Sequence, residues 1–173
     1  MRLGIFALLM ITLFTNGCAT TKPHEPATSI GPFNTFTGRL IVIEPARRWQ
    51  VIIDWNGTPI EGTVRLTHAA SNRIVQVAWD PEVMQIRDNA DRSQQWINVS
   101  KEALSENGII LPPQQLAQIL SGSMPVELVE KRSGEWEGRI DGSFIRIKWL
   151  DEQQRLELID MTHGRTAILI IQP

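Results

Sequence analysis

Short stretches of alternating apolar and polar residues make up most of the chain beyond residue 35. Trp49, Val51, Ile53 and Trp55 would lie on one face of a strand, with Asp54 on the other face. Similar short apolar segments recur at 36–44, 64–66, 75–79, 84–86, 96–99, 126–128, 136–140, 145–149, 156–158 and 167–171. This rhythm is typical of antiparallel sheets and predicts about nine strands.

The strand rhythm is interrupted once, over residues 99–126. Ser100 can cap a short helix that ends near Gly108. Pro112-Pro113 opens a second helix, which Ser121-Gly122 ends. The apolar face of that second helix carries Leu116, Ile119 and Leu120. The chain is therefore predicted to be mainly β, a single strongly curved antiparallel sheet whose concave face is covered by a short helical lid.

The first residues follow a different pattern. Arg2 precedes the apolar run 3–14, which is too short to span a bilayer and ends on Gly17-Cys18. This arrangement resembles the bacterial lipoprotein signal, in which the cysteine is acylated and becomes the new N-terminus. Cys18 is the only cysteine, so no internal disulfide can form. We predict a signal peptide at 1–17 and lipidation at Cys18, with ordinary cleavage as the alternative.

The residue after the cysteine decides sorting in lipoproteins of this type, where an aspartate usually retains the protein at the inner membrane. Ala19 instead implies the inner leaflet of the outer membrane, with the domain facing the periplasm. Residues 18–34 contain three prolines and show no hydrophobic period, which predicts a polar tether. The folded domain is then expected at 35–173.

Composition narrows the class of partner. The chain of 173 residues has a formal charge of −2 and six tryptophans but no tyrosine. Without basic clusters it is not expected to bind nucleic acid. There is no glycine-rich phosphate loop and no Gly-x-Ser-x-Gly motif, and His24, His68 and His163 are scattered. Glu135 and Glu137 are expected on a solvated outer face. We predict no catalytic residue, metal or cofactor.

Tryptophans recur on the apolar faces of the predicted strands. If these faces line one concavity, the interior is either a filled core or a cavity for acyl chains, because apolar walls select apolar ligands. Periodicity does not separate the two, and the pattern by itself favours the filled core. The candidate lipid-binding residues are Trp49, Val51, Ile53, Trp55, Leu66, Trp79, Leu116, Ile119, Leu120, Trp136, Ile145, Ile147 and Trp149.

The order of these segments resembles a known family. Phe36-Thr37-Gly38-Arg39-Leu40-Ile41-Val42 is similar to the first strand of the LolB-type lipoprotein receptors, Trp55 stands at an aromatic position of their second strand, and 109–125 resembles their helical insert. The resemblance implies an unclosed β-barrel with helices as a lid over a hydrophobic cavity. It also implies transfer of lipoprotein acyl chains from the periplasmic carrier LolA to the outer membrane, without covalent catalysis, by a protein expected to be a monomer.

The chain departs from the family pattern at three places. The family carries an exposed leucine on a protruding loop, whereas the matching loop here, 68–72, offers only Ala69 and Ala70. A proline-rich tether stands in place of the usual N-terminal helix, and the usual terminal tryptophan is missing. We therefore expect a LolB-like lipoprotein that binds acyl chains or lipoproteins. The alternative is a non-catalytic envelope lipoprotein that uses its sheet as a protein-binding or assembly module, and an enzyme ranks third.

Overall fold

The computed structural model describes residues 29–91, 93, 95–106 and 109–172. They form one antiparallel sheet in the order β6-β5-β4-β3-β2-β1-β11-β10-β9-β8-β7. The predicted signal peptide, Cys18 and most of the predicted tether lie outside the described residues. The strands are β1 (Thr35–Ile43), β2 (Arg48–Gly57), β3 (Gly62–His68), β4 (Arg73–Trp79), β5 (Met84–Asp88), β6 (Ile97–Asn98), β7 (Leu128–Arg132), β8 (Glu135–Ile140), β9 (Ser143–Leu150), β10 (Arg155–Asp160) and β11 (Arg165–Gln172).

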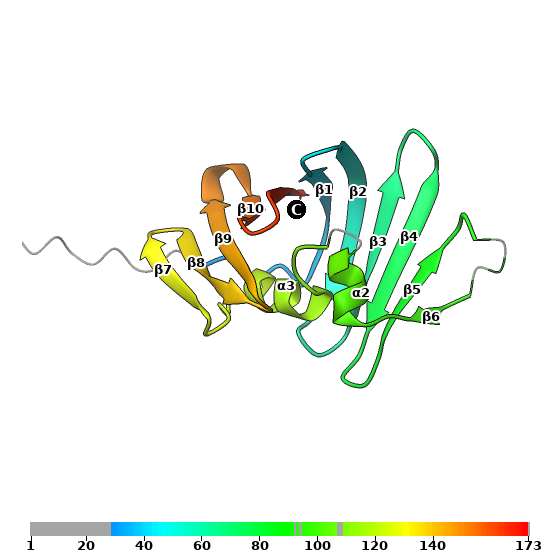
Figure 1. The fold of residues 1–173 in the computed structure, drawn as a ribbon, viewed down its shortest axis with the longest axis horizontal. Coiled ribbons are helices and arrows are strands. Elements are labelled where there is room, and N and C mark those ends of the chain that lie inside the picture. Colours follow the sequence, from blue (N-terminus) through cyan, green and yellow to red (C-terminus); the bar gives the residue numbers. More distant parts are fainter. Residues whose placement is uncertain (1–28, 92, 94, 107–108, 173) are drawn as a thin grey trace, which may run out of the picture.

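The predicted fold class is confirmed, since the sheet is single, antiparallel and strongly curved (Figure 1). The described strands number eleven rather than about nine. The difference arises because every apolar segment pairs, including β6, whose two residues contact β5. The strands β6 and β7 end the sheet and do not pair with each other, so the barrel is unclosed.

The first and last strands lie side by side at the centre of the sheet. β1 pairs with β11 from Thr37 opposite Gln172 to Ile43 opposite Thr166. From this seam, consecutive antiparallel strands lead outward on both sides. The sheet therefore has two halves, β2–β6 on one side of the seam and β7–β10 on the other.

Two helices lie on the concave side between these halves (Figure 1). They are α2 (Lys101–Glu106) and α3 (Pro113–Leu120), close to the predicted positions. Pro113 suits the first turn because the missing N–H would have no helical partner there. Ile119 and Leu120 are fully buried, and Leu116 packs against the core. The predicted inward face of the second helix is therefore confirmed.

Residues just before β1 are part of the packing. Ile30 is buried, and the backbone N–H of Phe33 donates to the carbonyl of Leu120 at 2.8 Å. The ring of Phe33 lies 5.6 Å from the ring of Trp149, measured between centroids. Residues 30–33, which were expected to belong to the tether, are thus attached to the end of α3.

The outer face of β8 and β9 carries charged side chains in pairs of opposite sign. Glu135 and Glu137 both contact Arg146, and Glu135 also lies 3.8 Å from the ammonium group of Lys148. These carboxylates face away from the core, as the sequence predicts, and each has a cation beside it. The structure brings no reactive partner to them, so the pair is a surface ion-pair network.

Candidate functional site

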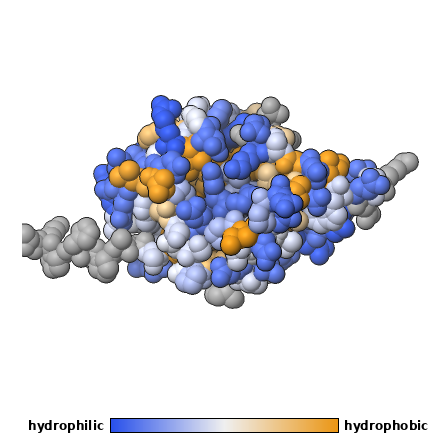
Figure 2. Space-filling view, turned by 90° about the horizontal axis from the view of Figure 1, so that it is seen from below, coloured by the Kyte–Doolittle hydropathy of each residue, from blue (hydrophilic) through white to orange (hydrophobic). Residues whose placement is uncertain are grey.

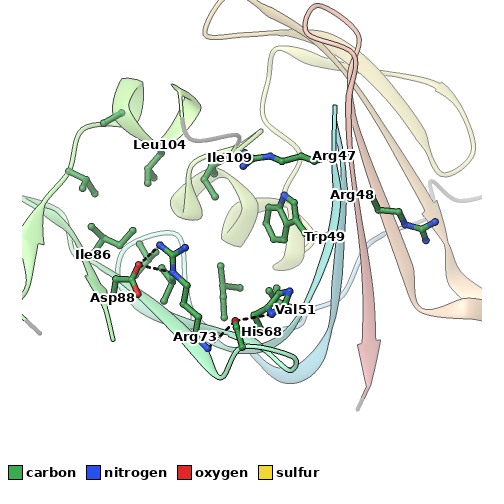
Figure 3. Close-up of a pocket in the computed structure, with 16 residues that line it drawn as sticks. Arg47, Arg48, Trp49, Val51, His68, Arg73, Ile86, Asp88, Leu104 and Ile109 are labelled. Atoms are coloured by element: carbon green, nitrogen blue, oxygen red, sulfur yellow. Dashed lines mark hydrogen bonds and ion pairs between the residues drawn. The ribbon is translucent and has the colours of Figure 1, made fainter. Parts of the chain in front are cut away.

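An open groove lies on the concave face of one half of the sheet. It has a volume of about 630 Å³ and is lined by inner positions of β2–β5 together with α2 and Ile109. Figure 3 shows Trp49 and Val51 on one wall, with Ile86 and Leu104 across from them. The volume falls within the range of roughly 300–1,000 Å³ that small-molecule sites occupy.

The groove is hollow because its inner side chains are short relative to the curvature of the sheet. Val51, Leu66, Val75, Val77 and Ile86 supply the inner positions of successive strands. Such aliphatic residues pack well on a pleated surface but do not reach across a concave face. The groove therefore has apolar walls that no residue of the opposite half covers.

Aromatic rings close one end of the groove. The ring of Trp55 lies 5.2 Å from that of Trp79 and 6.1 Å from that of Phe36. The indole N–H of Trp79 donates to the carbonyl of Thr58 at 3.0 Å, which fixes the ring. A Cβ atom at Gly62 would lie 2.4 Å from this indole, so the glycine is needed for the ring to fit. The opening of the groove is thus at the other end of the strands.

A smaller apolar chamber continues the groove under α3. It has a volume of about 90 Å³ and shares five lining residues with the groove, which are Trp49, Leu66, Val77, Leu104 and Ile109. Trp55 lines this chamber, and its indole nitrogen is buried without a hydrogen-bond partner in the structure. Most of the chamber wall is aliphatic, so it extends the apolar character of the groove inward.

The open end of the groove carries charged side chains in pairs. Arg73 donates from Nε to a carboxylate oxygen of Asp88 at 2.9 Å, and Arg47 donates to Glu44 at 2.7 Å. Hydrogen bonds from these arginines hold the pKa of Asp88 and of Glu44 below their usual values. Figure 3 shows Arg48 pointing away from the groove. The entrance therefore carries polar side chains with almost no net charge, whereas the interior of the groove is apolar.

The loop matched to the family's protruding loop lies at this entrance. The imidazole of His68 and the hydroxyl of Ser71 are 3.0 Å apart, and both residues line the groove. Ala69 and Ala70 are exposed between them. The loop therefore borders the groove and has small side chains at its tip.

The structure divides the candidate lipid-binding residues into two sets. Five of them line the groove or the chamber, which are Trp49, Val51, Ile53, Trp55 and Leu66, and Leu116 joins them from α3. The others are buried in the core and are not lining residues of either cavity, which are Trp79, Ile119, Leu120, Trp136, Ile145, Ile147 and Trp149. Trp79 lies at the aromatic end of the groove, Ile119 and Leu120 belong to α3, and the remaining four lie on β8 and β9.

Several groove residues were not among the candidates. Val75, Val77 and Ile86 follow the same alternation as the residues that were selected, so strand periodicity could have found them. Leu104 lies within the short helix α2 and Ile109 lies after it, where no period marks an inner face. Their position depends on how the insert folds back over the sheet.

Among residues 29–172, apart from the four undescribed positions, no cluster of three or more His, Cys, Asp or Glu could hold a metal ion. None of the helices described is long and apolar enough to cross a bilayer.

Comparison with family models identifies one family. Residues 34–143 match the family model described as "Outer membrane lipoprotein LolB". Among solved structures, the chain is similar to a LolA superfamily protein from Nitrosomonas europaea. That similarity has a TM-score of 0.45 and 11% identity, and it covers 83% of this chain and 86% of the other. A comparison with curated proteins found no match.

Proposed function

Because the chain belongs to the LolB family of outer membrane lipoproteins, we propose that its groove binds the acyl chains of lipoproteins. The observation that carries this proposal is the open groove of about 630 Å³ with apolar walls and a polar entrance. An acyl chain would bury its methylenes against β2–β5, each contributing about 0.8 kcal/mol, while its polar end stays at the entrance.

The family is one of outer membrane lipoproteins with a role in lipoprotein localisation. For this chain we propose an anchor at Cys18, in the inner leaflet, with the groove accessible from the periplasm. A periplasmic carrier would then deliver acyl chains to it, and transfer requires only that the chains bind the groove more tightly than the carrier. Cys18→Ser should abolish acyl labelling, and unchanged membrane anchoring in this variant would contradict the anchor.

A pair of variants on one strand tests the groove. Leu66 faces the groove, while the neighbouring Thr67 faces outward between Ile52 and Ile74. Leu66→Trp should fill the groove and abolish binding of a fluorescent fatty acid. Thr67→Trp places the same ring on the outer face of the sheet and should leave binding unchanged. The mature chain with Cys18→Ser serves as the parent, so that its own lipid does not compete.

Thermal stability provides a second measurement. A ligand that binds only the folded state must raise the melting temperature. The parent and Thr67→Trp should be stabilised by saturating palmitate, and Leu66→Trp should not. If palmitate and a synthetic lipopeptide both leave the melting temperature of the parent unchanged, the groove is not an acyl site.

One observation favours the assembly-module alternative. Isoleucines gather on the outer face of the central strands, where Ile41 is paired with Ile168 and both Ile52 and Ile170 flank Arg39. The side chain of Ile52 is 43% exposed. If acyl ligands do not bind, a photo-crosslinker at position 52 should capture an envelope protein that one at Gln50 captures less efficiently.

A further inference from the structure

A second cleft lies on the outer face of the sheet, away from the groove. It has a volume of about 450 Å³ and is open on one side. Its polar side chains come from outward positions of four adjacent strands, β1 to β4, and Trp96 approaches from the loop before β6. These polar residues are Thr35, Thr37, Asp54, Asn56, Thr63, Arg65 and Gln76. The strand register therefore builds a continuous polar floor.

The cleft contains one acidic and one basic side chain among neutral ones. Arg65 is directly opposite Asp54 on one side and opposite Gln76 on the other. Thr37 donates to Asp54 at 3.2 Å, but the side chain of Arg65 forms no hydrogen bond or ion pair with any residue the structure describes. Asp54 would repel an anionic ligand, and Arg65 would repel a cationic one. A neutral ligand with many hydroxyl groups can donate to the first and accept from the second.

Trp96 supplies an aromatic surface at the side of this floor. The guanidinium of Arg87 lies 4.7 Å from the centre of the indole, and Arg87 also donates to Gln76 at 3.1 Å. These contacts hold the ring beside the cleft. Trp96 is still 38% exposed, so Arg87 covers only part of it. A rigid aromatic surface next to convergent polar groups suits a ligand with both apolar and polar faces.

We infer that this outer cleft binds an oligosaccharide. A sugar ring has an apolar C–H face that can stack on Trp96 and equatorial hydroxyl groups that can reach Asp54, Arg65 and Gln76. This site is separate from the acyl groove, since the two sets of lining residues have none in common and the cleft lies on the opposite face of β2 to β4. Glycan strands and free oligosaccharides share this chemistry.

The test uses the full-length protein, solubilised in detergent, and three probes. These are an N-acetylglucosamine oligomer, which resembles a peptidoglycan strand, a malto-oligosaccharide and inorganic phosphate. Binding is measured by calorimetry at millimolar ligand, the range expected for a few hydrogen bonds and one stacked ring. At least one oligosaccharide should bind and phosphate should not, and the oligosaccharide that binds identifies the preferred glycan.

Three variants show where the ligand binds. Trp96→Ala should weaken oligosaccharide binding by about tenfold or more, because the stacking surface is removed. Ile97→Ala removes the next side chain, which is exposed but does not line the cleft, and should leave binding unchanged. Arg65→Gln should also weaken binding, and all three variants should bind fatty acid as the parent does.

The possible outcomes separate this inference from the proposed function. Absence of binding by both oligosaccharides, phosphate binding in their place, or equal binding by Trp96→Ala would each overturn the oligosaccharide site. Fatty-acid binding, by these variants and by Leu66→Trp, is measured separately on the mature chain with Cys18→Ser. Its loss in Leu66→Trp concerns only the groove.

Discussion

The two halves of the sheet follow the same alternation of inner and outer residues, but their interiors differ. In the β7–β10 half, the inner residues Ile145, Ile147 and Leu156 are fully buried, and none of them lines the groove. In the β2–β6 half, inner residues such as Leu66 and Val75 line an open groove. Figure 2 shows that one outer face of the molecule is mostly hydrophilic, with separate hydrophobic patches.

The position of the helices accounts for the difference. Ile119 and Leu120 of α3 are fully buried, and Phe33, which donates to the Leu120 carbonyl, packs its ring against Trp149 of the β7–β10 half. In front of the other half lies α2, which contributes Ala103 and Leu104 to the wall of the groove. One half therefore provides stability through close packing, and the other retains apolar surface for a ligand.

The largest expected effect comes from the same truncation made in each half. Leu156 is fully buried, so Leu156→Ala should leave a cavity and cost about 3–5 kcal/mol in the free energy of unfolding. Leu66 faces the groove, so Leu66→Ala removes apolar contacts without enclosing a new void and should cost about 1–2 kcal/mol. Urea unfolding of both variants measures the difference. Equal costs would mean that the groove closes in solution.

The next largest effect is expected at the aromatic end of the groove. In Gly62→Ala the new Cβ would lie 2.4 Å from the Trp79 indole and 2.5 Å from the Cα of Gly57. This crowding should cost roughly 1–3 kcal/mol. Thr63→Ala, next in the strand and facing outward, should change stability by less than about 0.5 kcal/mol. A neutral Gly62→Ala variant would show that Trp79 is free to move.

The fold could be predicted because alternation determines which residues share a face. Trp49, Trp55, Trp136 and Trp149 were all placed on inner faces, and the structure has them there, with Trp49 only partly buried. The interruption of the strand rhythm likewise located both helices, including the buried face of α3. These features are local, and a single stretch of sequence contains the information for each.

The division into a filled and a hollow half could not be predicted in the same way. Trp55 lines a cavity and Trp136 fills a core, but their sequence surroundings are alike. The difference depends on where α3 lies relative to the sheet, which is a long-range property. Ile30 was missed as a core residue because it is a single apolar residue between prolines and glycine. The outer cleft was missed because its residues are scattered over several strands.

The dependence of affinity on the length of the fatty acid measures how far the open groove extends. Affinity for saturated fatty acids should rise by about 0.8 kcal/mol, or nearly fourfold, with each added methylene until the groove is full. Calorimetric titration of a series of increasing length gives this slope. Ile86→Phe, which narrows the groove, should move the plateau to shorter chains. An affinity independent of length would place the ligand outside the groove.

The smallest effect is expected at the entrance. Because Arg73 lowers the pKa of Asp88, their ion pair stabilises the fold above the ordinary aspartate value near pH 4 and is lost as pH falls through the lowered value. The side chain of Asp88 is 24% exposed and that of Arg73 is 59% exposed, so solvent screens the pair. Asp88→Asn should therefore cost less than about 1 kcal/mol at pH 7 and almost nothing near pH 2.

Urea unfolding at the two pH values, with and without high salt, measures this cost. A larger cost that persists in acid and in salt would mean that Asp88 stabilises the loop through its bond to the Ala90 N–H, and that the entrance belongs structurally to the packed part of the domain.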